Sequence, residues 1–302
     1  MTYTPDDAQL IKDLELEWDV IDGFFGRFST ADWMRPHGKD WTFGDVPYHL
    51  MVFHNLFAES LRRGTNHDGE PEIRTLRELN QWNAARFQQR PTNQTGAQSF
   101  GLLKRSIENM HTAMRALGNP EPDMDRPCWL PLLRVRGVHT ARIAIDYTYW
   151  HDWLHLCEAN LRYNDHLPRY TDEMMHRALN FHMHITARSV DPSKITGDYV
   201  WHLDLLGNGG GAWTFNFSPN VPVLVQQGLI GTPNLHTTRT IADYLKLTAF
   251  NMMRINPLQT MFNSARSYEA RKLAHIQALF NGSEDQVMQP IEDAEIEPEI
   301  VA

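Results

Sequence analysis

Hydrophobic residues in the first half of the chain recur at steps of three and four positions. This spacing is the period of an amphipathic helix with one buried stripe. The first stripe consists of Leu10, Ile11, Leu14, Trp18, Ile21, Phe25 and Phe28. Further helices are predicted over about residues 45–63, 75–90, 95–117, 140–164 and 171–188. We find no strand signal before Val190, so the first half is expected to be all-α.

The pattern changes after Pro192, where β-formers and Gly-rich breaks replace the helical period. Three successive antiparallel strands are predicted over residues 199–206, 212–217 and 221–225, and helices over about 240–250, 257–264 and 268–280. The fold class is therefore multidomain, with an all-α first half and an α+β second half. The expected domains are 1–190, 191–282 and an acidic, disordered tail over 283–302.

Composition narrows the classes of function. The chain has 302 residues and a formal net charge of -9, which argues against binding to a nucleic-acid backbone. Two cysteines, Cys128 and Cys157, are too few for a disulfide framework. No apolar run reaches the roughly 18 residues of a membrane span. We therefore expect a cytoplasmic protein that binds small molecules and neither nucleic acid nor membrane.

The spacing of the histidines is the feature of the sequence that indicates a chemical site. His151 and His155 are four residues apart on a strongly periodic helix, so their rings project from one face. Taken alone, such a pair is more often one core histidine and one surface histidine than a metal clamp. His49 adds a second observation, because it lies in the buried stripe of the helix over 45–63. A buried imidazole without a partner would lose its solvation at a cost.

The two observations together predict a metal site. His54 lies five residues after His49 and points about 140° away from it, so it is not expected at the same site. Three neutral imidazoles from two helices leave a coordination position open. The predicted ligands are His49, His151 and His155. Asp45 is the N-cap candidate of the helix that carries His49.

Two segments of the first half resemble a known family. The stretch from Trp41 to Leu50 resembles the W-T-x-x-D-V-x-x-H-L entry to the second helix of the DinB-like superfamily, which includes mycothiol-dependent maleylpyruvate isomerases. The segment from Arg142 to Leu156 resembles the later metal-binding helix of that superfamily. The isomerase branch typically has Glu where this chain has His151, so the ligands are similar to those of DinB. The resemblance implies a metal-binding four-helix bundle.

The second half resembles a sterol-carrier-protein-like domain. The features that carry this resemblance are the Gly-rich turn, Trp213, Asp243, the Asn256-Pro257 pair and the final Leu279-Phe280. Such a module is fused to DinB-like bundles in several thiol-dependent enzymes. The resemblance therefore implies an α+β domain with an antiparallel sheet.

The family resemblance implies a function. A divalent metal, with zinc as our choice and nickel or iron as alternatives, would hold a low-molecular-weight thiol as its thiolate. The thiol would attack an electrophilic small molecule, giving S-transfer or cis-trans isomerisation. Glu158 lies on the same helix face as the histidine pair and is the candidate catalytic proton shuttle. A carboxylate at the rim of the bundle is an equally good interpretation of Glu158.

Two other functions stay open from the sequence alone. The chain can be a binding protein that takes an apolar ligand in a groove of the C-terminal domain, with a metal that is structural or absent. It can also be a helical bundle whose metal site is occupied but inert. Both share the helical pattern and the histidines, so the sequence does not separate them from the enzyme.

Overall fold

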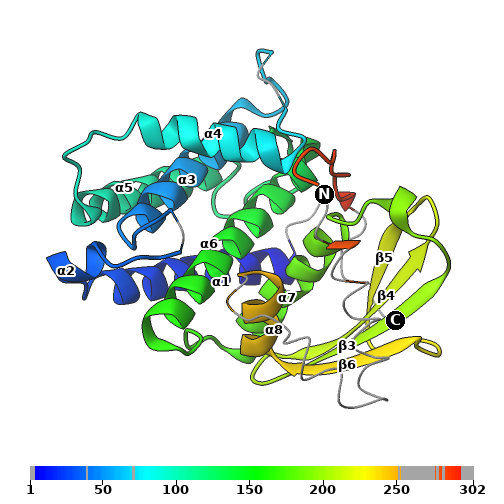
Figure 1. Ribbon diagram of the computed structural model, residues 1–302. Coiled ribbons are helices and arrows are strands. Elements are labelled where there is room, and N and C mark those ends of the chain that lie inside the picture. The colour runs from blue at the N-terminus through cyan, green and yellow to red at the C-terminus, as the bar shows by residue number, and fades with distance from the viewer. Residues whose placement is uncertain are drawn as a thin grey trace. The chain divides into compact units, whose positions relative to one another are not determined.

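The chain divides into two units, which meet in the sequence between Pro168 and Arg169. Figure 1 shows the computed structural model. The structure describes residues 4–38, 40–69, 72–250, 252, 276, 279–280 and 283–293. No helix among these residues is long and apolar enough to cross a membrane.

Four long helices build the first unit. They are α1 (Pro5–Phe25), α3 (Asp45–Arg63), α5 (Gly96–Arg115) and α6 (Ala141–Asn164). Helix α3 runs beside α5, and α6 packs against both α1 and α3 (Figure 1). Two shorter helices join the long ones, α2 (Thr30–Trp33) and α4 (Leu76–Gln88). The predicted helical bundle is therefore present.

The stripe predicted for the first helix is its buried face. Leu14 and Ile21 are fully buried, and Trp18 is 4% exposed. Thr4 begins the helix, because its side chain accepts a hydrogen bond from the Asp7 N–H while the Asp7 carboxylate caps Thr4 in return. Phe28, the last member of the predicted stripe, lies beyond the helix end.

The start of α3 differs from the prediction. Gly44 is the N-cap and makes no side-chain capping bond, so the prediction of Asp45 as N-cap is wrong. The Asp45 carboxylate instead accepts hydrogen bonds from the backbone and side chain of Thr42, at 2.6 and 2.7 Å. It also forms an ion pair with Arg90. These bonds hold the loop that precedes the helix carrying His49.

The first unit also contains a small β-ribbon. Strands β1 (Pro127–Leu130) and β2 (Gly137–Thr140) pair antiparallel. This corrects the expectation of an all-α first half without strands. Each strand has only four residues, too few for a period-two pattern to stand out against the irregular sequence around it. Strand β2 leads directly into α6, because its last residue, Thr140, is the N-cap of that helix.

A four-stranded sheet forms the second unit. Its strands are β3 (Tyr199–Leu206), β4 (Gly211–Ser218), β5 (Val221–Gln227) and β6 (Leu235–Thr240). The spatial order is β5-β4-β3-β6, with β3 and β6 parallel and the other neighbours antiparallel. The sheet is therefore mixed, and the prediction of a purely antiparallel sheet is wrong. Strand β6 is polar and mostly exposed, so it lacks the apolar pattern that revealed the other three.

Two helices accompany this sheet. Helix α7 (Asp172–Ala187) contacts β4 and β5, and α8 (Ile241–Thr248) contacts β3 and β6. The Trp213 indole donates a hydrogen bond to Asn180 on α7 at 3.1 Å. These contacts explain why the division falls before α7, about twenty residues ahead of the boundary drawn at 190. A unit defined by contacts need not coincide with a family domain, and that boundary stays a prediction.

The C-terminal predictions lie mostly outside the described residues. This applies to the helix over 257–264, to most of the helix over 268–280, and to residues 294–302 of the acidic tail. Within 283–293, Met288 and Ile291 are each only 1% exposed. The Gln286 side chain donates a hydrogen bond to the Ser189 carbonyl at 3.2 Å. Part of this segment is therefore buried, while the disordered tail over 283–302 as a whole stays a prediction.

Candidate metal centre

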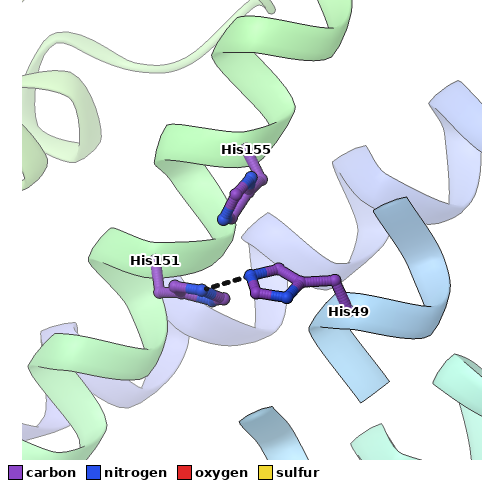
Figure 2. A group of neighbouring side chains, drawn as sticks. All are labelled: His49, His151 and His155. Carbon is purple, nitrogen blue, oxygen red and sulfur yellow. Dashed lines mark hydrogen bonds between the residues drawn. The ribbon is translucent and has the colours of Figure 1, made fainter. Parts of the chain in front are cut away.

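Three histidines from two helices converge inside the first unit. His49 comes from α3, and His151 and His155 come from α6 (Figure 2). One ring nitrogen from each lies within 4.8 Å of the other two. The Nε2 atoms of His49 and His151 are 3.2 Å apart. The structure therefore brings together the three histidines that the sequence predicts.

Helix geometry explains the convergence. His151 and His155 are one turn apart on α6, so both rings face α3 (Figure 2). His49 faces them because it lies in the buried stripe of α3, and α3 packs against α6. His49 and His151 are each 5% exposed, and His155 is partly exposed. His155 is therefore the most exposed of the three, and the other two are buried.

Aromatic side chains form the walls of the site. The Phe53 ring stacks on His151 with centroids 4.1 Å apart. Trp41 lies edge-on to His49 at 4.9 Å and parallel to His155 at 6.3 Å. Apolar walls lower the local dielectric and exclude water, so charges in the site interact more strongly than at the surface.

The rings are neutral near physiological pH. Burial is the largest cause that lowers the pKa of His49 and of His155, and the neighbouring histidines lower it further. Burial also lowers the pKa of His151, although the Asp152 carboxylate acts in the opposite direction. A neutral imidazole has a free lone pair, which is the form that binds a metal.

The donor set fits a divalent ion. Nitrogen ligands at about 2.0–2.1 Å from a tetrahedral ion lie about 3.3 Å from each other. The 3.2 Å between His49 Nε2 and His151 Nε2 matches that spacing. The Nδ1 atom of His155 is buried and has no hydrogen-bond partner among the described residues. Three imidazoles also leave a fourth coordination position for a substrate or water.

A buried carboxylate next to His151 is hydrogen-bonded to two other helices, and the spacing pattern of the sequence does not indicate this. The Asp152 carboxylate accepts hydrogen bonds from His54 at 2.7 Å and from the Trp18 indole at 3.0 Å. Its Oδ1 lies 3.9 Å from Nδ1 of His151. Burial raises the pKa of Asp152, but His54 and His151 outweigh it and hold the pKa at about 2. The carboxylate is therefore charged and can orient the ring of His151.

His54 is excluded from the histidine group, as predicted. It is fully buried, and its Nδ1 lies 3.3 Å from the Ser106 hydroxyl while Nε2 faces Asp152. The different directions of the two side chains around the helix axis correctly predicted that His54 lies outside the group that contains His49. Helix geometry could not predict that His54 binds Asp152, because Asp152 is 98 residues away in the sequence.

His37 is a second residue that the sequence pattern missed. It lies in the loop before α3, is 3% exposed, and has an Nε2 atom without a hydrogen-bond partner among the described residues. Burial lowers the pKa of His37 to about 4, and the nearby charge of Arg162 adds to the effect. Its proximity contributes to lowering the pKa of His155, so His37 lies near the group without belonging to it.

Glu158, the predicted catalytic carboxylate, forms an ion pair on α6. Its Oε1 lies 2.7 Å from the Arg162 guanidinium, and its side chain is 18% exposed. Burial raises the pKa of Glu158, while Arg162 lowers it in part. Glu158 is not a member of the histidine group. Cys157 is fully buried, which raises the pKa of its thiol, and it also lies outside the group.

Comparison with known proteins identifies the first unit. Residues 13–159 match the model of the DinB superfamily. Comparisons with curated proteins and with solved structures gave no match. The matched residues run from within α1 to most of α6 and include His49, His151 and His155. The chain therefore contains a DinB superfamily domain, and the buried histidine group lies within it.

Proposed function

We propose that the chain is a divalent-metal-dependent enzyme that uses a low-molecular-weight thiol. The reaction is S-transfer to an electrophilic small molecule, or its cis-trans isomerisation. The observation that carries the proposal is the convergence of three neutral imidazoles, two of them buried, whose number leaves a fourth coordination position of a tetrahedral ion open. A site built only to hold the bundle together would have closed that position with a fourth side chain.

His49, His151 and His155 would hold the ion. When bound, a divalent ion supplies a Lewis acid that lowers the pKa of a thiol or water beside it. Imidazole ligands suit zinc, nickel and iron, and we choose zinc because it commonly occupies open three-ligand sites.

The other residues of the site have separate tasks. Trp41 and Phe53 exclude water from around the reacting sulfur, and Asp152 fixes the ring orientation of His151. Glu158 accepts the proton that the thiol releases, and its raised pKa suits a group that both takes and returns a proton. In S-transfer a carbon–sulfur bond forms and remains. In isomerisation it breaks again after rotation about the former double bond.

A second candidate function rests on the second unit. Val221, Leu224, Leu229 and Ile230 are each about half exposed, on and after the edge strand β5. Such apolar exposure favours a protein that binds an apolar ligand, as a sterol-carrier-like domain would. Uptake of a fluorescent fatty acid that is unchanged in His151→Ala, together with the absence of any turnover, would favour this function over the enzyme.

A thiol screen tests the proposed reaction. Metal-loaded protein is incubated with a panel of small cellular thiols and electrophilic alkenes, and the products are followed by mass spectrometry. We expect at least one pair to give a thioether or an isomerised alkene, and His151→Ala to lose the activity. His236→Ala, which changes an exposed histidine of the second unit, is the matched control. A fully metal-loaded wild type that forms no product across the panel would contradict the proposal.

A further inference from the structure

Phe87, on the last turn of α4, lies against the walls of the histidine group. Its ring meets Trp41 edge-on with centroids 5.0 Å apart, and Trp41 in turn faces both His49 and His155. The Phe87 ring is also within 3° of parallel to the His49 ring, with 6.5 Å between the centroids. Phe87 therefore forms part of the surroundings of His49, although it belongs to a different helix.

Trp82, near the middle of the same helix, contacts the group through Phe53. The two rings meet edge-on with centroids 5.5 Å apart, and Phe53 stacks on His151. Both Trp82 and Phe87 are partly exposed to solvent. These contacts place α4 over the part of α3 that carries Phe53 and His49, with aromatic rings in between (Figure 1).

Helix α4 is packed less tightly than the rest of the first unit. Of the described helices of that unit, it is the one without a buried side chain. Its C-terminal end is fixed by the Tyr48 hydroxyl, which donates a hydrogen bond to the Arg86 carbonyl at 2.9 Å, and by the ion pair of Arg90 with Asp45. A segment with few buried contacts opens at a lower free energy than a packed interior. The rest of α4 can therefore move while the bundle stays folded.

We infer that α4 is a displaceable cover of the histidine group, and that Trp82 and Phe87 set the size of the ligand that reaches it. The inference rests on the metal site of the proposed function and not on the thiol reaction. His49 and His151 are each 5% exposed, so a molecule with an aromatic ring reaches them only if a wall moves. Phe53 is 3% exposed within the packed face of α3, whereas α4 lies at the surface. Helix α4 is the wall that can move.

Histidine labelling of the metal-free protein tests the cover. Diethyl pyrocarbonate acylates neutral imidazoles, and tandem mass spectrometry of the peptides gives the rate at each histidine. We expect Phe87→Ala to label His49 several-fold faster than wild type does. His54 should stay protected in both proteins, because it is fully buried beside Asp152. His54 therefore reports on the folding of the bundle within the same experiment.

Trp82→Ala should have the same effect on His151, because it removes the ring that covers Phe53. The matched control is Phe28→Ala. Phe28 is also a partly exposed aromatic residue of the first unit, but it packs against Trp33, with centroids 4.9 Å apart. This control should leave the labelling of the three histidines unchanged. In wild type, α4 should exchange its amide hydrogens faster than α3.

Cobalt-loaded protein tests the selection by size. Imidazole and 4-phenylimidazole offer the ion the same donor atom and differ by one aromatic ring, and the visible cobalt spectrum reports the Kd of each. We expect Phe87→Ala to improve the affinity for 4-phenylimidazole relative to imidazole by about tenfold. Phe28→Ala should keep the wild-type ratio.

Equal labelling of His49 in Phe87→Ala and Phe28→Ala would overturn the inference. A rise at His54 as large as that at His49 would do the same, because it would mean that the whole bundle had loosened. Equal hydrogen exchange in α4 and α3, or an unchanged ratio of the two cobalt ligands, would also contradict it. The labelling needs no metal, so selective exposure of His49 in a protein that holds no ion would refute only the metal-dependent function.

Discussion

The Nε2 atom of His54 lies 2.7 Å from Oδ2 of Asp152, and neither side chain is exposed to solvent. The same carboxylate accepts a hydrogen bond from Trp18 on α1. Asp152 therefore links three helices at the residue next to His151. This arrangement couples the stability of the bundle interior to the orientation of a metal ligand.

Asp152→Asn is expected to weaken metal binding. The change removes the negative charge that lies 3.9 Å from Nδ1 of His151, and outer partners of this kind typically change metal affinity about 10- to 100-fold. The affinity is measured by competition with a coloured chelator.

The matched control for Asp152 is Asp7→Asn. Asp7 is also a buried carboxylate of the first unit, but its partner is Arg142, at 2.6 Å. We expect Asp7→Asn to lower stability without changing metal affinity. Equal affinity losses in the two variants would mean that Asp152 acts only through the stability of the bundle.

His184 makes the stability of the second unit depend on pH. Burial, with the charge of Arg188, lowers the pKa of His184 from 6.5 to about 4. Below pH 6.5 the unfolded chain binds a proton that the folded chain does not, so stability falls as pH falls toward about 4. Urea unfolding should show a loss of at most about 2 kcal/mol between about pH 7 and about pH 5 from this group.

His184→Gln should reduce that pH dependence by the same amount. His236→Gln, at an exposed position, should leave it unchanged. A pH dependence that is identical in wild type and His184→Gln would show that the pKa of this ring is not lowered by folding.

Asn180→Ala tests whether α7 belongs with the sheet. Trp213 is fully buried, and the variant leaves its indole N–H without its acceptor, which costs about 1–3 kcal/mol. Hydrogen exchange followed by mass spectrometry should show faster exchange in β3 and β4. Asn216→Ala, at a partly buried bond on β4, should have a smaller effect. Faster exchange in α1 and α6 alone would assign α7 to the first unit instead.

The period of the sequence was sufficient to predict the long helices of the first unit and the histidine group, although not the short helix α2. Leu14, Ile21 and Leu50 are fully buried as their stripes require, and the four-residue spacing placed His151 and His155 on one face. These features depend on local geometry, which is the same for every α-helix. The change of period after Pro192 also predicted three of the four strands of the second unit.

Long-range pairing could not be predicted in the same way. Strand β6 pairs in parallel with β3, but its polar residues carry no signal of that partner. The partner of His54 is 98 residues away in the sequence. Such relationships depend on the packed structure and not on the spacing of residues along one element.

Metal content is the most direct test of the central claim. The chain is expressed in metal-replete cells and purified without chelators, and its metal is quantified by elemental analysis beside His49→Ala and the control His236→Ala. We predict about one divalent ion per chain in wild type and in the control, and loss of that ion in His49→Ala. Wild type without stoichiometric metal, or His49→Ala with its full complement, would contradict a metal site at His49, His151 and His155.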